Sequence, residues 1–237
     1  MTTQLFKSSH RGTADFGWLK ANYSFSFANY FNPNSIQFGM LRVLNDDTIA
    51  GGMGFGTHPH ENMEIITIPL EGALKHRDSM DNEGTISYGE VQVMSAGTGI
   101  QHSEANANAA EQLKLLQLWI FPDTENVKPR YEQKAFDLEN HLNSFVTIVT
   151  PKDSNDGNAL WIHQKAFLNL GVFESGNTNY KINFPENGVY LFLIEGQIEV
   201  DNQTLTAKDA IGIKDCDAIE IKIVAKAKIL IIEVPTM

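Results

Sequence analysis

Residues 68–74 read Ile-Pro-Leu-Glu-Gly-Ala-Leu, and residues 192–198 read Phe-Leu-Ile-Glu-Gly-Gln-Ile. Each stretch has the pattern of two strand segments joined by a Glu-Gly turn. Gly72 and Gly196 lie 124 residues apart (196 − 72), about half of the 237-residue chain. Either two unrelated hairpins share a Glu-Gly turn, or the chain contains a duplicated β-barrel, and a duplication would also explain the length.

Apolar or alternating runs recur on both sides of these stretches. They span residues 36–43, 64–70, 85–94, 113–121, 145–150, 189–200 and 219–234. Turn residues separate the runs, for example at Asn45–Asp47 and at Asp81–Gly84. Many short strands with turn residues between them predict an all-β sandwich or barrel. Residues 131–142 are the best candidate for a helix.

Composition and charge restrict the classes of partner and compartment. The net charge is −11 with His neutral, so the chain should repel phosphate backbones, and direct binding to nucleic acid or to an anionic membrane is disfavoured. Cys216 is the single cysteine, so no intrachain disulfide needs an oxidising compartment. The first 18 residues lack the apolar core of a signal peptide, and we expect a cytoplasmic protein.

A first pair of candidate metal ligands lies in Gly-Thr-His58-Pro-His60-Glu-Asn-Met-Glu64. Residues two apart on a strand point to the same face, so His58 and His60 should project side by side. Pro59 lacks a backbone N–H donor, which predicts that this stretch lies at the edge or start of a strand.

A second pair lies in Gly97-Thr-Gly-Ile-Gln-His102-Ser-Glu104. The same spacing puts His102 and Glu104 on one face, and an intervening hairpin or two could bring both pairs together inside a barrel. Gly97 and Gly99 would let the backbone turn sharply before His102, although a plain tight hairpin explains them equally well.

Three imidazoles and one carboxylate suit one divalent ion such as Fe, Ni, Zn, Mn, Cu or Co, with positions left open for substrate or O₂. A single His-x-His pair occurs often by chance, whereas His-x-His followed by His-x-Glu is a much stronger signal. The other histidines are isolated, and we expect surface or ordinary hydrogen-bonding roles for His10, His76, His141 and His163.

Two further assignments stay open. Glu64 would share the parity of the histidines on a regular strand, so it is either an alternative ligand to Glu104 or a hydrogen-bond acceptor that orients a histidine. We prefer Glu104 as the ligand because it is paired closely with a histidine. The apolar residues near the motif either line a pocket above the metal or fill the barrel core; they are Met53, Phe55, Ile66 and Met94.

These residues carry a family resemblance. The pattern Gly52-x5-His58-x-His60-x3-Glu64-x7-Gly72 resembles the first cupin motif, and residues 89–102 resemble the second. More narrowly, His-Pro-His-Glu-Asn-Met-Glu followed by Thr-Gly-Ile-Gln-His-Ser-Glu is similar to pirins, especially the bacterial pirin-like quercetinases. Residues 10–19 and 25–30 also look like that family. The resemblance is close in the N-terminal half and general in the C-terminal half.

The resemblance implies a bicupin, that is, two stacked cupin barrels of the double-stranded β-helix or jelly-roll type. It implies a metal-binding domain over residues 1–140, with His58, His60, His102 and Glu104 as ligands and Glu64 outside the ligand set. It also implies a second cupin domain over residues 141–237 without a metal site. At the 124-residue offset, Ile182 and Phe184 replace the first two histidines.

The activity associated with this family is that of quercetin 2,3-dioxygenase. It implies a flavonol or similar small aromatic substrate, O₂, iron as the first candidate metal, and Glu104 as the catalytic base. The alternative from the same resemblance is a metal-binding regulatory protein that acts through a protein partner. A third hypothesis, sugar isomerisation with zinc, would require polar and basic residues where this sequence has Met, Ile and Phe.

Overall fold

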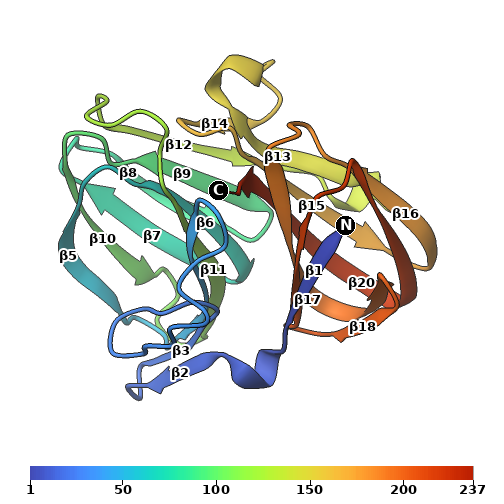
Figure 1. The fold of residues 1–237 in the computed structure, drawn as a ribbon. Coiled ribbons are helices and arrows are strands. Elements are labelled where there is room, and N and C mark those ends of the chain that lie inside the picture. The colour runs from blue at the N-terminus through green and yellow to red at the C-terminus, as the bar shows by residue number, and fades with distance from the viewer. Residues whose placement is uncertain (237) are drawn as a thin grey trace.

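The computed structural model describes residues 1–236, and within this range no α-helix is present. Three one-turn 3-10 helices interrupt the strands: η1 (Ser8–His10), η2 (Glu139–His141) and η3 (Lys152–Ser154). Figure 1 shows two barrels, built from the first and second halves of the chain and packed against each other. The prediction of an all-β protein with two stacked cupin barrels is confirmed.

Two sheets form the first barrel. A seven-stranded sheet has the order β12 (Arg130–Ala135), β9 (Glu90–Ser95), β6 (Glu64–Glu71), β11 (Leu113–Ile120), β4 (Leu41–Ile49), β3 (Leu19–Tyr23) and β2 (Gly12–Asp15). A four-stranded sheet has the order β5 (Gly54–His60), β10 (Ile100–Asn106), β7 (Ala73–Asp78) and β8 (Glu83–Ser87). Pro59 therefore lies on an edge strand, as its missing N–H donor requires.

One larger sheet forms the second barrel. Its main path is β1 (Thr2–Phe6), β19 (Ala210–Lys214), β17 (Asn187–Val200), β20 (Ala218–Pro235), β15 (Phe167–Phe173), β13 (Phe145–Pro151) and β14 (Leu160–Ile162). Strand β16 (Gly176–Lys181) pairs with β20, and β18 (Gln203–Thr206) pairs with β17.

The first strand of the chain belongs to the second barrel. Strand β1 pairs antiparallel with β19, and in Figure 1 the chain then crosses below both barrels to enter the first one at β2. Asp209 fastens this crossing, because its carboxylate accepts hydrogen bonds from the Lys7 ammonium and the Ser8 backbone N–H. The division into domains of residues 1–140 and 141–237 stays a proposal. Strand β1 does not follow it, because β1 belongs to the first range but pairs with β19 of the second.

Each Glu-Gly stretch joins two strand segments, as the sequence pattern predicts, but both form corners of a barrel, so the alternative of two hairpins is wrong. Strand β6 ends at Glu71 and β7 begins at Ala73, but these strands belong to different sheets. Glu195 and Gly196 lie inside the continuous strand β17, where the pairing with β20 shifts register. Gly196 has a φ of 94°, and a Cβ there would lie 2.1 Å from the Lys226 carbonyl oxygen, so the corner requires glycine.

Two other predictions of local structure are also wrong. Residues 131–142 are not a helix, because Tyr131–Ala135 pair with β9 and only Glu139–His141 form a helical turn. Asn45–Asp47 are not a turn, because they lie in the middle of β4 and pair with both β3 and β11. In both cases long-range strand pairing overrides the local preference of the residues.

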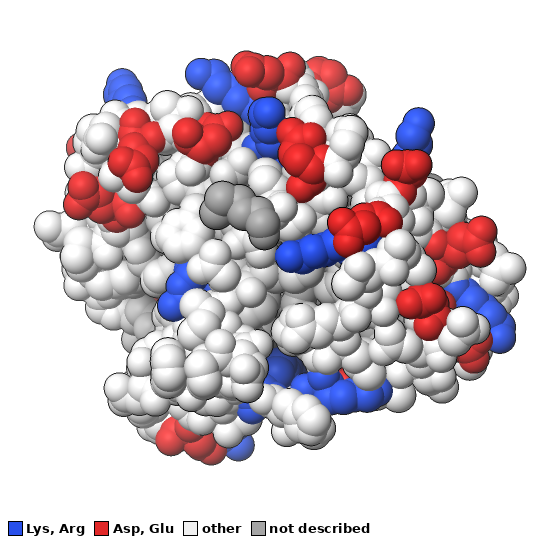
Figure 2. All heavy atoms as spheres, in the orientation of Figure 1, with Lys and Arg blue, Asp and Glu red and all other residues white. Residues whose placement is uncertain are grey.

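The largest apolar core lies between the barrels. It combines side chains from the first half, such as Leu41 and Ile66, with side chains from the second half, such as Tyr190 and Leu230. On the face shown in Figure 2, acidic side chains gather along the upper part of the molecule with basic side chains among them. None of the helices among residues 1–236 has the length and apolar character needed to cross a membrane.

Candidate metal centre

Strands β5 and β10 bring three of the predicted ligands together. Their antiparallel register places His102 opposite His58 and Ile100 opposite His60. One ring nitrogen from each of His58, His60 and His102 lies within 4.8 Å of the other two. The three histidines that the sequence spacing selects therefore lie close together, and their role as metal ligands stays a prediction.

The separation of the ring nitrogens fits one shared ion. Nε2 of His102 lies 3.0 Å from Nε2 of His58. Two nitrogens that bind one divalent ion at right angles, each at about 2.1 Å, are separated by about 3 Å. The donor set is also suitable, because imidazole nitrogen binds Zn, Cu, Fe and Ni. The three histidines thus fit a divalent metal ion.

The second ring nitrogen of two histidines is already engaged. Nδ1 of His58 lies 2.8 Å from the Gly56 carbonyl oxygen, so it carries the hydrogen and leaves Nε2 for an ion. Nδ1 of His102 lies 3.2 Å from Nε2 of His76. Such contacts fix the orientation of a ligating ring.

His76 is the residue that sequence reasoning missed. It lies on β7, opposite Glu104 in the register with β10, and its ring stacks on Tyr131 at 4.7 Å between centroids. It is buried at 1% exposure and its Nε2 contacts His102, so it is neither isolated nor on the surface, and of the two predicted roles hydrogen bonding applies. His76 and Asp78 are two residues apart and share one face of β7, but this spacing does not reveal which strand the face meets. Only the pairing of β7 with β10 brings His76 to His102.

Burial favours the neutral form of His60 and His102. It lowers the pKa of His60 to about 4, with a further contribution from His58. The pKa of His102 is also lowered, first by burial and then by the three neighbouring histidines. Neutral imidazole has the free lone pair that a metal requires, so the cluster is ready to bind an ion at neutral pH.

Glu104 lies near the three histidines but is not part of their cluster, and its carboxylate is bound by Gln117. Its Oε2 accepts a hydrogen bond of 2.8 Å from Nε2 of Gln117, whereas its Oε1 finds no partner among the described residues. Burial raises its pKa to about 7. The pairing of β10 with β5 shifts register here because β5 has the extra residue, whereas the pairing of β10 with β7 is regular, so His102 and Glu104 share one face of β10. The role of Glu104 as fourth ligand stays a prediction.

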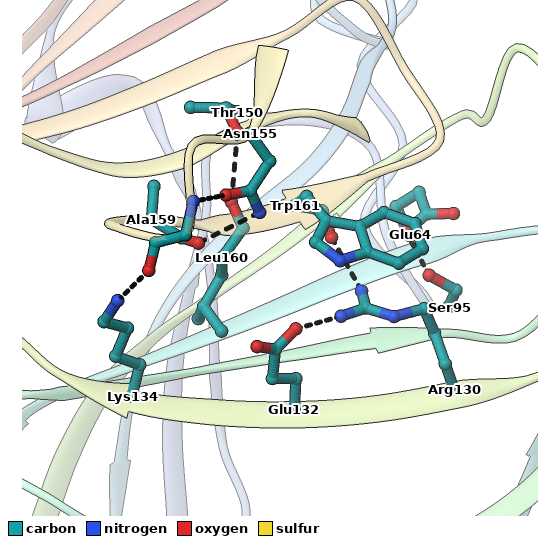
Figure 3. Close-up of polar contacts among 11 residues, drawn as sticks. Glu64, Ser95, Arg130, Glu132, Lys134, Thr150, Asn155, Ala159, Leu160 and Trp161 are labelled. Atoms are coloured by element: carbon teal, nitrogen blue, oxygen red, sulfur yellow. Dashed lines mark hydrogen bonds and ion pairs between the residues drawn. The ribbon is translucent and has the colours of Figure 1, made fainter. Parts of the chain in front are cut away.

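Glu64 faces away from the histidines. The chain leaves β5 after His60, turns at Asn62 with a φ of 47°, and enters β6 in the other sheet, so the parity argument does not apply. The Glu64 carboxylate accepts a hydrogen bond of 2.7 Å from the Ser95 hydroxyl and lies near Arg130, whose guanidinium stacks on Trp161 of the second barrel (Figure 3). The prediction that Glu64 orients a histidine is therefore wrong.

A cavity of about 500 Å³ opens beside the candidate metal centre. His58 and Glu104 contribute to its wall together with Gln117. The rest of the wall is rich in aromatic side chains, which are Phe16, Trp18, Tyr23, Phe27, Phe55 and Trp119. Trp119 also contacts the His60 ring edge-on, with 4.8 Å between ring centroids. The geometry can hold a flat aromatic molecule next to a metal ion.

The four apolar residues considered for this pocket divide between it and the core. Phe55 lines the cavity. Ile66 belongs to the core between the barrels, and Met94 packs in a small cluster with Ile65. Met53 is 43% exposed.

Ile182 and Phe184, the residues at the 124-residue offset from His58 and His60, lie between β16 and β17. Ile182 packs in the core of the second barrel, and Phe184 contacts Phe167 at 5.8 Å between ring centroids. Within residues 1–236, the cluster of His58, His60 and His102 is the only group of His, Cys, Asp or Glu close enough to share an ion.

Two family models match this chain, one in each half. The family model described as Pirin matches residues 6–120, and the model described as Quercetinase C-terminal cupin domain matches residues 147–234. A quercetin 2,3-dioxygenase of Escherichia coli is 39% identical, covering 98% of each chain, and a pirin-like protein of Caulobacter vibrioides is 40% identical, covering 94% of this chain and 95% of the relative. The crystal structure of the bacterial pirin YhhW from Escherichia coli in complex with nickel(II) superposes with a TM-score of 0.93 at 38% identity, covering 100% of both chains.

Proposed function

The chain belongs to the pirin family, and on that premise we propose that it is a metal-dependent dioxygenase that cleaves flavonol-type substrates with O₂. The observation that carries the proposal is the cluster of three histidines beside an aromatic cavity, to whose wall His58 and Glu104 contribute. A relative over nearly the whole chain is named quercetin 2,3-dioxygenase, which supports the same substrate class.

The proposed ligands are His58, His60, His102 and Glu104. A bound divalent ion would supply Lewis acidity and a means of activating O₂. Iron is our first candidate, and the structure of a relative with nickel(II) supports nickel as a second. Zn, Mn, Cu and Co also suit the donor set.

Glu104 is the proposed general base. Its carboxylate is buried in the cavity wall beside His58, where a substrate hydroxyl that lies against the metal centre can reach it. The unpartnered Oε1 can accept the proton of the flavonol 3-hydroxyl, while Gln117 holds Oε2 in place. Addition of O₂ across the heterocycle then opens the ring and releases carbon monoxide, and both oxygen atoms enter the products.

Two alternatives receive less support. A regulatory protein that acts through a protein partner is not favoured, because relatives over the whole chain are named as dioxygenases. Sugar isomerisation is disfavoured by the aromatic wall, to which no Lys or Arg among the described residues contributes. The cytoplasm stays our proposed compartment, since the single cysteine needs no oxidising environment.

The test is O₂ consumption by protein loaded with one divalent metal at a time and supplied with quercetin. We expect uptake of O₂ together with loss of the flavonol, and a decrease of kcat by about 100-fold or more for Glu104→Gln. Glu64→Gln is the matched control, because Glu64 is equally buried and its pKa is also raised to about 7, but it faces away from the cavity. Absence of turnover with every metal would overturn the proposal.

A further inference from the structure

Strand β4 presents two polar side chains to the cavity. Asn45 and Asp47 are two residues apart, so they share one face of the strand, and both line the cavity. They are only 3% and 4% exposed. Buried polar groups of this kind are normally hydrogen-bonded.

Both side chains nevertheless have an oxygen without a partner. Oδ1 of Asn45 and Oδ1 of Asp47 accept no hydrogen bond from any group in residues 1–236. Asp46, between them on the other face of β4, is different, because its carboxylate pairs with Arg11 at 3.4 Å and with Lys208 at 3.2 Å. The chain thus provides two cations for Asp46, and it provides no Lys or Arg to the described cavity wall beside Asp47.

The two acceptors lie in the sheet that does not carry the histidines. Strand β4 belongs to the seven-stranded sheet, whereas His58 and His102 lie in the four-stranded sheet. Asn45 is opposite Gln117 in the pairing of β4 with β11, and Gln117 also bonds to Glu104. The cavity therefore has the metal centre on one sheet and a second polar site on the other, with Trp18, Phe27 and other aromatic side chains on its wall.

We propose that Asn45 and Asp47 bind a pair of neighbouring phenolic hydroxyl groups on the pendant ring of the substrate, while the 3-hydroxyl of the substrate meets Glu104 on the other sheet. The two oxygens that accept no hydrogen bond from the described residues can both be satisfied by a group that offers two hydrogens. A phenolic hydroxyl can donate a hydrogen bond to the Asp47 carboxylate or accept one from the protonated carboxyl group, so it fits Asp47 in both protonation states. The preferred substrate is then a planar flavonol whose pendant ring carries vicinal hydroxyls. This inference rests on the proposed function.

Two flavonols that differ only in the pendant ring test the assignment. Quercetin carries vicinal hydroxyls on this ring, and the comparison compound has an unsubstituted phenyl ring. Trp18 and Trp119 line the cavity, so quenching of tryptophan fluorescence reports binding to the metal-loaded protein without O₂. KM and kcat in air are then measured for both compounds.

Asp47→Ala should weaken quercetin binding about tenfold and leave the unsubstituted flavonol within about twofold, since a buried hydroxyl left without its hydrogen-bond partner costs about that factor. Asn45→Ala should have a smaller effect of the same kind, and the isosteric Asp47→Asn should fall between Asp47→Ala and wild type. KM should rise while kcat changes less than about twofold. Asp46→Asn is the matched control on the same strand and should leave both affinities within about twofold.

Equal weakening of both compounds, or of neither, would overturn the assignment, since a structural role of Asp47 does not distinguish pendant rings. If wild type binds quercetin in the expected Asp47-dependent manner but turns over neither flavonol, the inference stands and the dioxygenase proposal fails. If wild type turns over both flavonols with equal KM, the dioxygenase proposal stands and the inference fails. If wild type binds neither compound, both fail.

Discussion

The interior of the first barrel is lined by histidine, carboxylate and amide side chains beside an aromatic cavity, whereas the interior of the second is filled mainly with isoleucine, leucine and valine. Buried polar atoms without a partner follow the same division within residues 1–236. On the strands of the second barrel, Asn187 is the only described residue with such an atom. In the first barrel such atoms belong to Asn45, Asp47, Thr67, His76, Gln92 and Glu104.

Glu104 and Glu233 show what this difference means. Both are buried, at 2% and 0% exposure. Glu233 in β20 accepts hydrogen bonds from the Tyr180 hydroxyl at 2.7 Å and from the side-chain amides of Asn183 and Asn187. Glu104 keeps one oxygen without a partner in the described structure. A satisfied carboxylate stabilises a fold, whereas an unsatisfied one is available to a ligand.

The largest expected effect comes from removing the central ligand of the first barrel. His102→Ala should reduce metal affinity at least about 100-fold, because His102 approaches both His58 and His76. Metal content per folded chain, measured by elemental analysis after dialysis, checks this. His141→Ala changes an exposed histidine and should leave metal content unaltered. Full metal content in His102→Ala would place the site elsewhere.

The second barrel should respond in stability rather than in metal binding. Ile231 is fully buried, and Ile231→Ala should lower the free energy of unfolding by about 3 to 4 kcal/mol because it leaves a cavity. Urea denaturation measures this change, and the metal content of the folded protein should stay the same. Val224→Ala, on the same strand but at a 43% exposed position, should cost less than about 0.5 kcal/mol. Loss of metal from Ile231→Ala would show that the barrels are coupled.

Glu64 makes the stability of the interface between the barrels depend on pH. Burial raises its pKa from 4.5 to about 7, so the folded state binds more protons than the unfolded state between these values. Stability should therefore fall as pH rises from about 4.5 to 7 and stay level above that, with a change of about 1 to 3 kcal/mol from this group.

Glu64→Gln should flatten this part of the profile, measured as the free energy of unfolding in urea at several pH values. The exposed neighbour Glu61→Gln should leave the profile unchanged. An identical slope in wild type and Glu64→Gln would show that another group causes the pH dependence.

The smallest effect should be a gain of stability in the first barrel. Both polar atoms of the Gln92 side chain are buried without a partner in residues 1–236, so Gln92→Met should raise the free energy of unfolding by about 1 kcal/mol. Thermal unfolding checks the sign. The exposed Gln101→Met serves as control and should change stability by less than about 0.5 kcal/mol. A loss of stability in Gln92→Met would mean that a bound group satisfies this amide.

Spacing along single strands predicted the part of the site that depends on local geometry. The intervals between His58 and His60 and between His102 and Glu104 are properties of one strand each, and the all-β class follows from short alternating runs. These patterns, with the family resemblance, were sufficient to identify the barrel that holds the histidine cluster.

Only the tertiary structure decided which residues from other strands reach that cluster. His76 meets His102 because β7 pairs with β10, and Asp47 faces the cavity because a stretch with turn-forming residues continues as β4. Glu64 turns away because the chain changes sheets after Asn62, and β1 joins the second barrel across about 200 residues of sequence. Strand pairing is a long-range interaction, so the register that selects these contacts is not encoded in any one segment.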